Sequence, residues 1–304
     1  MRYIAVLNRD ASSLKTADLD ALVEQIETRF GEEGHTISVT LHEGKDLPEA
    51  LGEAARSAEA DAILAGGGDG TISLAAGIAH DAKKALAILP GGNMNLFARS
   101  LGIPLDLEAA VDAVASGKPA KADIAFANDR PFIHEFSLGL RPKMIALRDR
   151  QSFGSRIGKL MGSVASLWRV LMRPPRVRVW FDDGHGNERR LVTAGLAISN
   201  NPFGEGHLPY ADRVDGGVLG VYLAHTVRPA ELAAIAARLS TGDWAGMPQM
   251  ERFTTTRLRL TRRGTIRAAM DGELVHMHGP VEIRTAPGAL TVIAPDEDHA
   301  RRGQ

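Results

Sequence analysis

Apolar positions in the first third of the chain follow two alternating periodicities. Short apolar runs typical of β-strands occur at 3–7, 36–41, 62–65 and 85–89, and apolar residues recur at helical spacing within 14–30, within 47–58 and after each of the last two runs. Strands that alternate with helices predict a parallel sheet covered by helices. We therefore expect an α/β domain over residues 1–121.

The pattern changes near residue 122. Strand-like stretches follow one another at 131–138, 177–181, 191–199, 218–223 and 257–260, and turn-forming residues occur at 182–184, 215–217 and 287–288. Consecutive strands separated by turns predict an antiparallel β-sandwich. This second domain is expected to span residues 122–304.

One segment of the second half, residues 155–173, has helical periodicity instead. Its apolar residues fall on one face: Ile157, Leu160, Met161, Val164, Leu167, Trp168 and Leu171. Basic residues dominate from Arg148 to Arg178, with Asp149 as the acidic exception. Such a helix could dock on an anionic membrane. A helix that packs on the sandwich and leaves its basic face in water is the more common case.

The composition limits which classes of partner and which compartments are expected. The chain of 304 residues has 36 Lys and Arg against 37 Asp and Glu, which gives no overall attraction to nucleic acid. The absence of cysteine excludes disulfides and thiolate metal sites and is consistent with a reducing compartment. No signal peptide and no uninterrupted apolar stretch of about 18 residues is found. We expect a cytoplasmic protein that reaches a membrane only at its periphery.

A glycine-rich loop follows the strand at 62–65. It reads Gly66, Gly67, Gly68, Asp69, Gly70 and Thr71, and helical spacing resumes after it. Glycines let backbone N–H groups approach phosphate oxygens, and a helix N-terminus favours negative charge, so the phosphates of ATP would fit here. Asp69 would hold Mg²⁺ or order the loop, and Thr71 would cap the helix or donate to phosphate. An ordinary glycine turn is the alternative.

A second glycine loop follows the strand at 85–89. It contains Pro90, Gly91, Gly92, Asn93 and Asn95, and again leads into a helix. Two such loops at the carboxyl ends of neighbouring strands predict a ligand crevice of the kind that open α/β sheets form.

Together the loops resemble the catalytic domain of the diacylglycerol kinase family, which includes sphingosine and ceramide kinases and bacterial lipid kinases. Residues 67–71 match the Gly-Gly-Asp-Gly-Thr signature. The second motif is matched by Pro90, Gly92, Asn95, Ala98, Arg99 and 101–104, with Asn93 in place of Thr and Leu96 in place of Asp. The resemblance implies that ATP is bound by Asn8, Thr40, Gly66, Gly67, Gly68, Asp69, Gly70, Thr71, Gly92, Asn93 and Asn95.

Two further motifs extend the resemblance into the second half. Asp215 begins a turn that binds a structural Mg²⁺ in bacterial relatives, although Gly216 replaces its second Asp. Asp271 and Glu273 match the Asp-Gly-Glu motif, in which Asp271 would be the general base and Glu273 would assist it or share a metal. Taken alone, Asp215 is more simply a turn residue and Asp271 a hairpin residue.

The resemblance implies an ATP-dependent lipid kinase that transfers the γ-phosphate to a hydroxyl of diacylglycerol or a related long-chain lipid, in a cleft between the domains. It also implies Mg²⁺ as cofactor and a last strand, residues 290–294, that returns to the first domain. Two alternatives stay open: a metabolite kinase of the NAD kinase type, and a non-catalytic relative that binds lipid or nucleotide. We expect a lipid partner and no nucleic acid, and the sequence leaves open whether the chain forms a homodimer.

Overall fold

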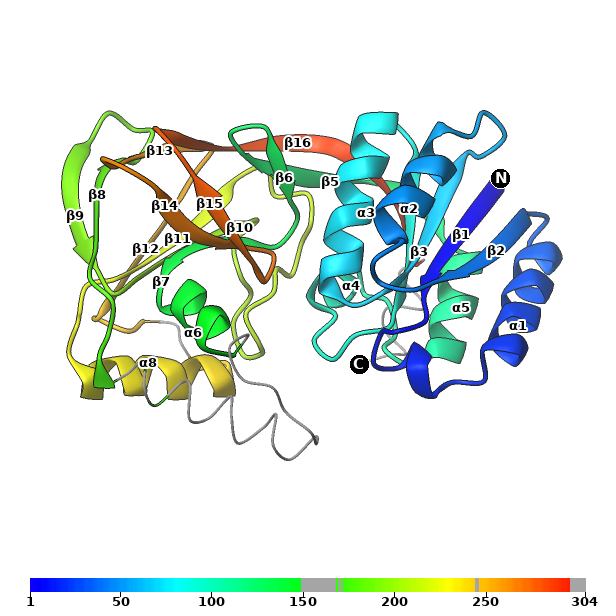
Figure 1. The fold of residues 1–304 in the computed structure, drawn as a ribbon, viewed down its shortest axis with the longest axis horizontal. Helices are drawn as coiled ribbons and strands as arrows, with labels where there is room; N and C mark the ends of the chain where they lie inside the picture. Colours follow the sequence, from blue (N-terminus) through cyan, green and yellow to red (C-terminus); the bar gives the residue numbers. More distant parts are fainter. Residues whose placement is uncertain (149–167, 169, 171, 244–245, 296–304) are drawn as a thin grey trace. The chain divides into compact units, whose positions relative to one another are not determined.

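The computed structural model describes residues 1–148, 168, 170, 172–243 and 246–295. The chain divides into two compact units (Figure 1). Unit 1 contains residues 1–124, 213–216 and 286–304, and unit 2 contains residues 125–212 and 217–285. Two strands, β5 (Lys118–Ala127) and β16 (Val281–Ala294), contribute residues to both units.

Unit 1 is an α/β domain with a parallel sheet, as the alternating pattern predicts. The strands run in the order β2, β1, β3, β4, β16, and each of these neighbours pairs in parallel. Its first four strands are β1 (Arg2–Asn8), β2 (Thr36–His42), β3 (Ala62–Gly67) and β4 (Ala85–Pro90). Every residue of β3 and β4 is buried, which explains their continuous apolar sequences. Val292 of β16 pairs with Leu86 of β4.

Helices cover both faces of this sheet. On one face lie α1 (Leu19–Glu32) and α5 (Leu107–Ala115), and on the other lie α2 (Leu47–Arg56) and α3 (Asp69–Ala82) (Figure 1). Two short helices, η1 (Leu14–Thr16) and α4 (Leu96–Ser100), complete the unit. The sequence predicts one helix from residue 14, but α1 begins at Leu19 because the side chain of Asp18 caps it by accepting a hydrogen bond from the N–H of Ala21.

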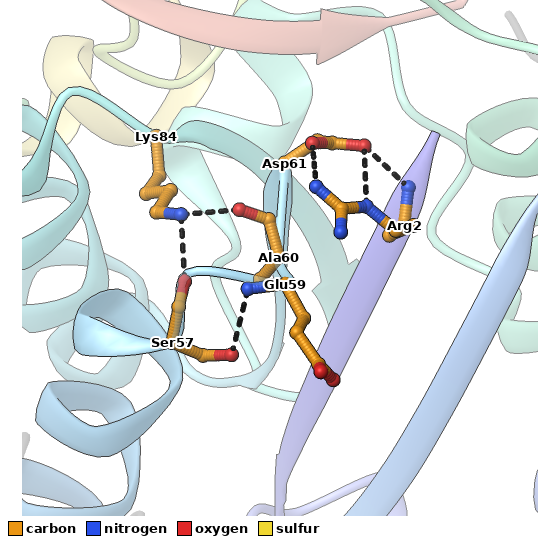
Figure 2. A network of polar contacts seen from close by, with 6 residues as sticks. All are labelled: Arg2, Ser57, Glu59, Ala60, Asp61 and Lys84. Atoms are coloured by element: carbon orange, nitrogen blue, oxygen red, sulfur yellow. Dashed lines mark hydrogen bonds and ion pairs between the residues drawn. The ribbon is translucent and has the colours of Figure 1, made fainter.

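Side chains also fix the loops at the amino ends of β3 and β4 (Figure 2). The Arg2 guanidinium contacts Asp61 at 3.0 Å, and the Asp61 carboxylate also accepts the backbone N–H of Arg2 at 2.8 Å. The Lys84 ammonium donates to the carbonyls of Ser57, at 2.9 Å, and Ala60. The Arg2 bonds hold the start of β1 against the loop before β3, and the Lys84 bonds hold the residue before β4 against the same loop. This is the end of the sheet opposite to the glycine loops.

Unit 2 is an antiparallel β-sandwich. One sheet has the order β12, β11, β10, β7, β14, β15, and the other places β13 between β16 and β8, followed by β9. The first sheet is formed by β7 (Glu135–Gly139), β10 (Gly195–Asn200), β11 (Leu219–Ala224), β12 (Met250–Thr255), β14 (Ile266–Met270) and β15 (Glu273–Met277). The second is formed by β8 (Val177–Asp182), β9 (Glu188–Thr193), β13 (Arg257–Thr261) and β16, while β6 (Arg130–Phe132) pairs with β5.

Apolar side chains from both sheets of unit 2 meet in one core. Its largest fully buried members are Phe132, Phe136 and Phe181. A smaller cluster packs around Leu232 and Ile235. Alternate residues along β8 and β13 face the core or the solvent, which is the period that the sequence shows.

Four details differ from the sequence expectation, three in unit 2 and one in the part of β16 that belongs to unit 1. The stretch 131–138 forms β6 and β7 with a break between them, and 191–199 forms β9 and β10, which separate at Ala194. The helices α6 (Leu140–Arg148) and α8 (Pro229–Thr241) were not predicted. The predicted turn at 287–288 is wrong: β16 continues through it, because Gly288 adopts a φ of 61° and its N–H donates to Asp123. Most of the amphipathic segment 155–173 lies outside the described residues.

Candidate functional site

The predicted nucleotide-binding residues of unit 1 gather at the carboxyl ends of its parallel strands. Asn8 ends β1, Gly66 and Gly67 end β3, and Thr40 lies near the end of β2. The register pairs Gly66 with Leu7 and Gly67 with Pro90. Parallel strands present these ends at one edge of the sheet, which is where open α/β sheets bind ligands.

The two glycine loops touch each other, and this contact requires glycine. The N–H of Gly91 donates to the carbonyl of Gly67 at 2.7 Å. A Cβ at Gly92 would lie 2.7 Å from the Cα of Gly68, and a Cβ at Gly67 would lie 2.6 Å from the Cβ of Thr71. Contacts of this length do not occur between real side chains and backbone, so any larger residue would force the loops apart.

Asp69 holds the second loop in place. One oxygen of its carboxylate accepts the N–H of Asn95 at 3.1 Å and the other accepts the N–H of Leu96 at 2.6 Å. Asn95 has a left-handed φ of 49°, and its side chain bonds both the N–H and the carbonyl of Gly92, at 2.9 and 2.8 Å. Leu96 thus contributes its backbone, while its side chain is buried. Of the two roles predicted for Asp69, the structure shows the ordering of the loop.

The other predicted contacts with the nucleotide differ in how their polar groups are used. The Asn8 amide donates to the Thr71 hydroxyl at 3.2 Å, which links β1 to the first turn of α3. The Thr40 hydroxyl donates to the carbonyl of Ala5 at 3.0 Å, so its proton is directed at the backbone of β1. Asn93 is exposed at the tip of the second loop.

The start of α3 has the features of an anion site. Gly68 is the N-cap, with extended backbone (φ −83°, ψ 179°) and no side-chain cap. The first N–H groups of a helix lack partners within it, and a glycine cap leaves them open to phosphate oxygens together with the positive end of the helix dipole. Gly70, in this first turn, is exposed. A nucleotide phosphate could therefore approach the backbone from solvent.

The carboxylate of Asp69 is the group at this loop that could bind Mg²⁺. Mg²⁺ in nucleotide sites takes one or two carboxylates and completes its shell with phosphate oxygens and water. Each oxygen of Asp69 accepts one N–H, and a carboxylate offers about four acceptor directions, so Asp69 can also ligate a metal. No group of three or more His, Asp or Glu side chains suited to a metal occurs within the described ranges.

Asp215 has a different partner. Its carboxylate is bound by the Arg213 guanidinium at 3.0 and 3.3 Å, and this hydrogen bond lowers the pKa of Asp215. Asp215 belongs to unit 1, where the carbonyl of Val214 accepts the N–H of Asp123 at 2.6 Å. A metal at Asp215 would have to displace Arg213, so metal binding there stays a prediction.

In unit 2, Asp271 lies in the tight turn between β14 and β15. Asp271 and Gly272 have φ of 47° and 88°, the left-handed pair of a two-residue hairpin. The carboxylate of Asp271 is buried and accepts three backbone N–H groups, from Ile133 at 2.9 Å, His134 at 3.0 Å and Glu135 at 2.9 Å. The hairpin predicted as the alternative is present, and the carboxylate is held in one orientation. Glu273, at the start of β15, is exposed.

Sequence reasoning gave no role to two neighbours of this carboxylate. The buried Glu135 pairs with the Arg141 guanidinium at 2.6 Å. Burial lowers the pKa of the His134 imidazole to about 4, the charge of Arg141 acts in the same direction, and the charge of Asp271 opposes them. Nε2 of His134 is buried and has no hydrogen-bond partner in the described part of the chain. His134 is therefore neutral at pH 7.

This histidine predicts a pH dependence of stability. Its pKa is 6.5 when unperturbed and about 4 in the fold, so acidification favours the unfolded state, which binds the proton more readily. We expect its contribution to stability to be constant above pH 6.5 and to be lost by pH 4, at most about 3 kcal/mol. Urea unfolding at pH 7, 6 and 5 measures this loss. His134→Gln should flatten the profile, and an unchanged profile would contradict the assignment.

An apolar pocket of about 210 Å³ lies in unit 2 beside these residues. Most of its wall is apolar, including Leu140, Ala197, Phe203, Ile235 and Leu239. Glu135, Ser137 and Arg141 add polar groups to the same wall. An apolar pocket with a few polar groups on one side is the common form of a site for an amphipathic ligand.

Comparison with known proteins agrees with this architecture. Residues 2–127 match the family model of the diacylglycerol kinase catalytic domain, and residues 156–294 match that of the YegS C-terminal NAD kinase beta sandwich-like domain. A diacylglycerol kinase of Staphylococcus epidermidis is 25% identical over 224 residues, which are 73% of this chain and 70% of the relative. A protein of Cronobacter sakazakii described as a probable lipid kinase, YegS-like, is 31% identical over 164 residues, 52% of this chain and 53% of the relative.

A crystal structure described as a diacylglycerol kinase of Bacillus anthracis has the same fold, with a TM-score of 0.71 at 17% identity and 97% of each chain covered. An α/β domain with paired glycine loops, followed by an antiparallel sandwich, is the two-domain architecture that the two matching family models describe. The chain belongs to the diacylglycerol kinase catalytic-domain family. The resemblance inferred from the sequence motifs is thereby confirmed.

Proposed function

We propose that the protein is an ATP-dependent lipid kinase that transfers the γ-phosphate of ATP to a hydroxyl of diacylglycerol or a related long-chain lipid. The observation that carries this proposal is the pair of glycine loops, which touch at Gly67 and Gly91 and are fixed by Asp69. This arrangement suits a polyphosphate, because it combines close backbone approach with a helix N-terminus. Membership of a kinase family supports the same activity.

Each residue has a role in this proposal. N–H groups at the start of α3 bind phosphate oxygens, and Asp69 orders the second loop and can hold Mg²⁺, which neutralises phosphate charge when bound. Asp271 takes the proton from the attacking hydroxyl, and three N–H donors aim its carboxylate. Phosphoryl transfer depends mainly on positioning and charge, so fixed groups of this kind are what the reaction needs.

The apolar pocket of unit 2 is the proposed site for part of the acceptor's hydrocarbon chain. Its volume of about 210 Å³ is smaller than a typical pocket for a whole ligand of ~300–1,000 Å³, so it would bury only part of a long acceptor. Its polar wall of Glu135, Ser137 and Arg141 would lie toward the polar end of the lipid.

The activity is tested by Mg²⁺-dependent transfer of labelled γ-phosphate from ATP to a panel of lipids in mixed micelles. Reactions with NAD and reactions without an acceptor serve as controls. A labelled lipid supports the proposal and identifies the acceptor class. Labelled NAD would replace it with a metabolite kinase, and ATP binding without any product would favour a non-catalytic relative.

The pocket assignment predicts a chain-length effect. Ala197→Phe would fill part of the pocket, so we expect KM for a long-chain acceptor to rise about tenfold, equivalent to ~1.4 kcal/mol, while KM for ATP stays unchanged. A short-chain acceptor should be much less affected. Ala234→Phe, at an exposed position of α8, is the matched control. Equal KM values of Ala197→Phe and wild type for every acceptor would place the acyl chain elsewhere.

A further inference from the structure

Large apolar side chains are exposed on the outer side of the sandwich unit. Trp180 is 52% exposed and Val192 is 47% exposed. In the described part of the chain, four of the seven exposed large apolar residues fall between 168 and 192, so their exposure is concentrated in one stretch rather than scattered. A concentration of this kind commonly marks an interaction surface.

The strand register surrounds these side chains with arginines. Trp180 lies opposite Arg190, and Val192 lies opposite Arg178. All four side chains are exposed, whereas their neighbours on β8 and β9, such as Val179, face the core. On the other side of Trp180 lies Thr261 of β13, which is followed by two exposed arginines. We call this surface the Trp180 face: Arg178, Trp180, Arg190 and Val192.

Charge is separated along this sheet. Toward the turn between β8 and β9, Asp182 lies opposite Glu188 on one side and Arg259 on the other. Arg259 in turn lies opposite Glu282. Three carboxylates and one guanidinium therefore meet at that end, while the Trp180 face at the other end is basic. The basic charge is thus local, although the chain as a whole is nearly neutral.

A cavity adjoins the same end of the sandwich. It measures about 380 Å³, and Arg262, the residue after Thr261, forms part of its wall. Leu147, Val177 and Ile266 line it with apolar surface, and further cations at its wall include Lys143 and Arg267. Among the residues of the described structure that line it, none is acidic. Apolar walls with a cationic rim suit an amphiphile whose polar end is anionic.

We propose that the Trp180 face docks on an anionic lipid bilayer. Trp is favoured at the interface between headgroups and acyl chains, and arginines beside it attract acidic lipids by about 1 kcal/mol each. Nucleic acid also binds cations and aromatic rings. It offers no apolar partner for the exposed Val192 or for the apolar cavity, whereas a lipid bilayer does. The docking does not depend on phosphate transfer, so it can be tested without the proposed kinase activity.

The test measures partitioning of the protein, without ATP, onto extruded vesicles of phosphatidylcholine alone or with 30% phosphatidylglycerol. We expect binding to the anionic vesicles only, weakening as salt rises. Arg178→Gln together with Arg190→Gln should reduce the partition coefficient about 25-fold, roughly fivefold for each arginine. Arg56→Gln together with Arg238→Gln, at exposed positions of α2 and α8, removes the same charge elsewhere and should bind like the wild type.

A second measurement locates the contact independently of charge. The chain has three tryptophans, and Trp168→Phe with Trp244→Phe leaves Trp180 as the only one. Its fluorescence should shift to the blue on anionic vesicles and be quenched by lipids brominated near the headgroup. Unchanged fluorescence with bound vesicles, equal binding of both double variants, or tighter binding to duplex DNA than to vesicles would each overturn the proposal. Equal thermal unfolding of all variants confirms that they are folded.

Discussion

Gly67→Ala is expected to weaken ATP binding at least tenfold and to destabilise unit 1. The new Cβ would lie 2.6 Å from both the Cβ and the hydroxyl of Thr71, so the start of α3 would have to move. Moving it would also disturb the Asn8 bond to Thr71 and the contact between Gly67 and Gly91. Overpacking of this kind costs about 1–3 kcal/mol of stability. We expect at least a tenfold loss of ATP affinity, measured by calorimetry, with thermal unfolding recorded in parallel.

Gly31→Ala provides the matched control for this experiment. Gly31 lies in α1, and a Cβ there would meet nothing within 4 Å. Alanine at this position should leave ATP affinity unchanged and stabilise the protein by up to ~1 kcal/mol, because alanine loses less backbone entropy in a helix. If Gly67→Ala bound ATP as tightly as Gly31→Ala does, the glycine loop would not be the phosphate site.

The α/β domain and its glycine loops could be predicted because their causes are local in sequence. A strand that is buried on both faces must be apolar throughout, as β3 is, and a loop that touches another backbone must use glycine, as Gly67 and Gly92 do. The sequence also predicts that Asp69 orders a loop, because a carboxylate among glycines needs hydrogen-bond partners. Its partners, Asn95 and Leu96, belong to the other predicted loop.

Contacts between distant segments could not be read in this way. The three N–H groups that bind Asp271 belong to Ile133, His134 and Glu135, more than 130 residues earlier in the chain. Backbone donors leave no signature in the sequence, so nothing marked this stretch as a partner. The helix α8 did leave a signal, because Pro229 at its start precedes Leu232, Ile235 and Leu239 at helical spacing. The helix was not predicted because the neighbouring segments all have the pattern of β-strands.

One substitution within a motif does not disturb the contact between the two glycine loops. Leu96 stands where the family pattern has an acidic residue. In the structure the N–H of Leu96 bonds Asp69, a contact that any residue other than proline can make. Its buried side chain packs within unit 1. This replacement therefore leaves the geometry of the loops intact, which weakens the case for a non-catalytic relative.

The general-base role proposed for Asp271 leads to the largest expected effect on activity. Asp271→Asn should lower kcat at least a hundredfold, as expected when a general base is removed. It should also destabilise unit 2 by about 1–3 kcal/mol, because an amide N–H would face a backbone N–H of Ile133, His134 or Glu135. Loss of activity alone therefore does not prove catalysis, and kcat has to be normalised to the folded fraction from urea unfolding.

A stability-matched variant separates the two effects of Asp271→Asn. Val221→Ala removes apolar volume from the fully buried core of unit 2 and should cost a similar free energy of unfolding without touching the hairpin. If Asp271 is the base, Val221→Ala keeps nearly full kcat at temperatures where it is folded, while Asp271→Asn does not, and both bind ATP normally through unit 1. Equal kcat per folded molecule in the two variants would reduce Asp271 to a structural anchor between the β14–β15 hairpin and the start of β7, and the proton acceptor would have to be found elsewhere.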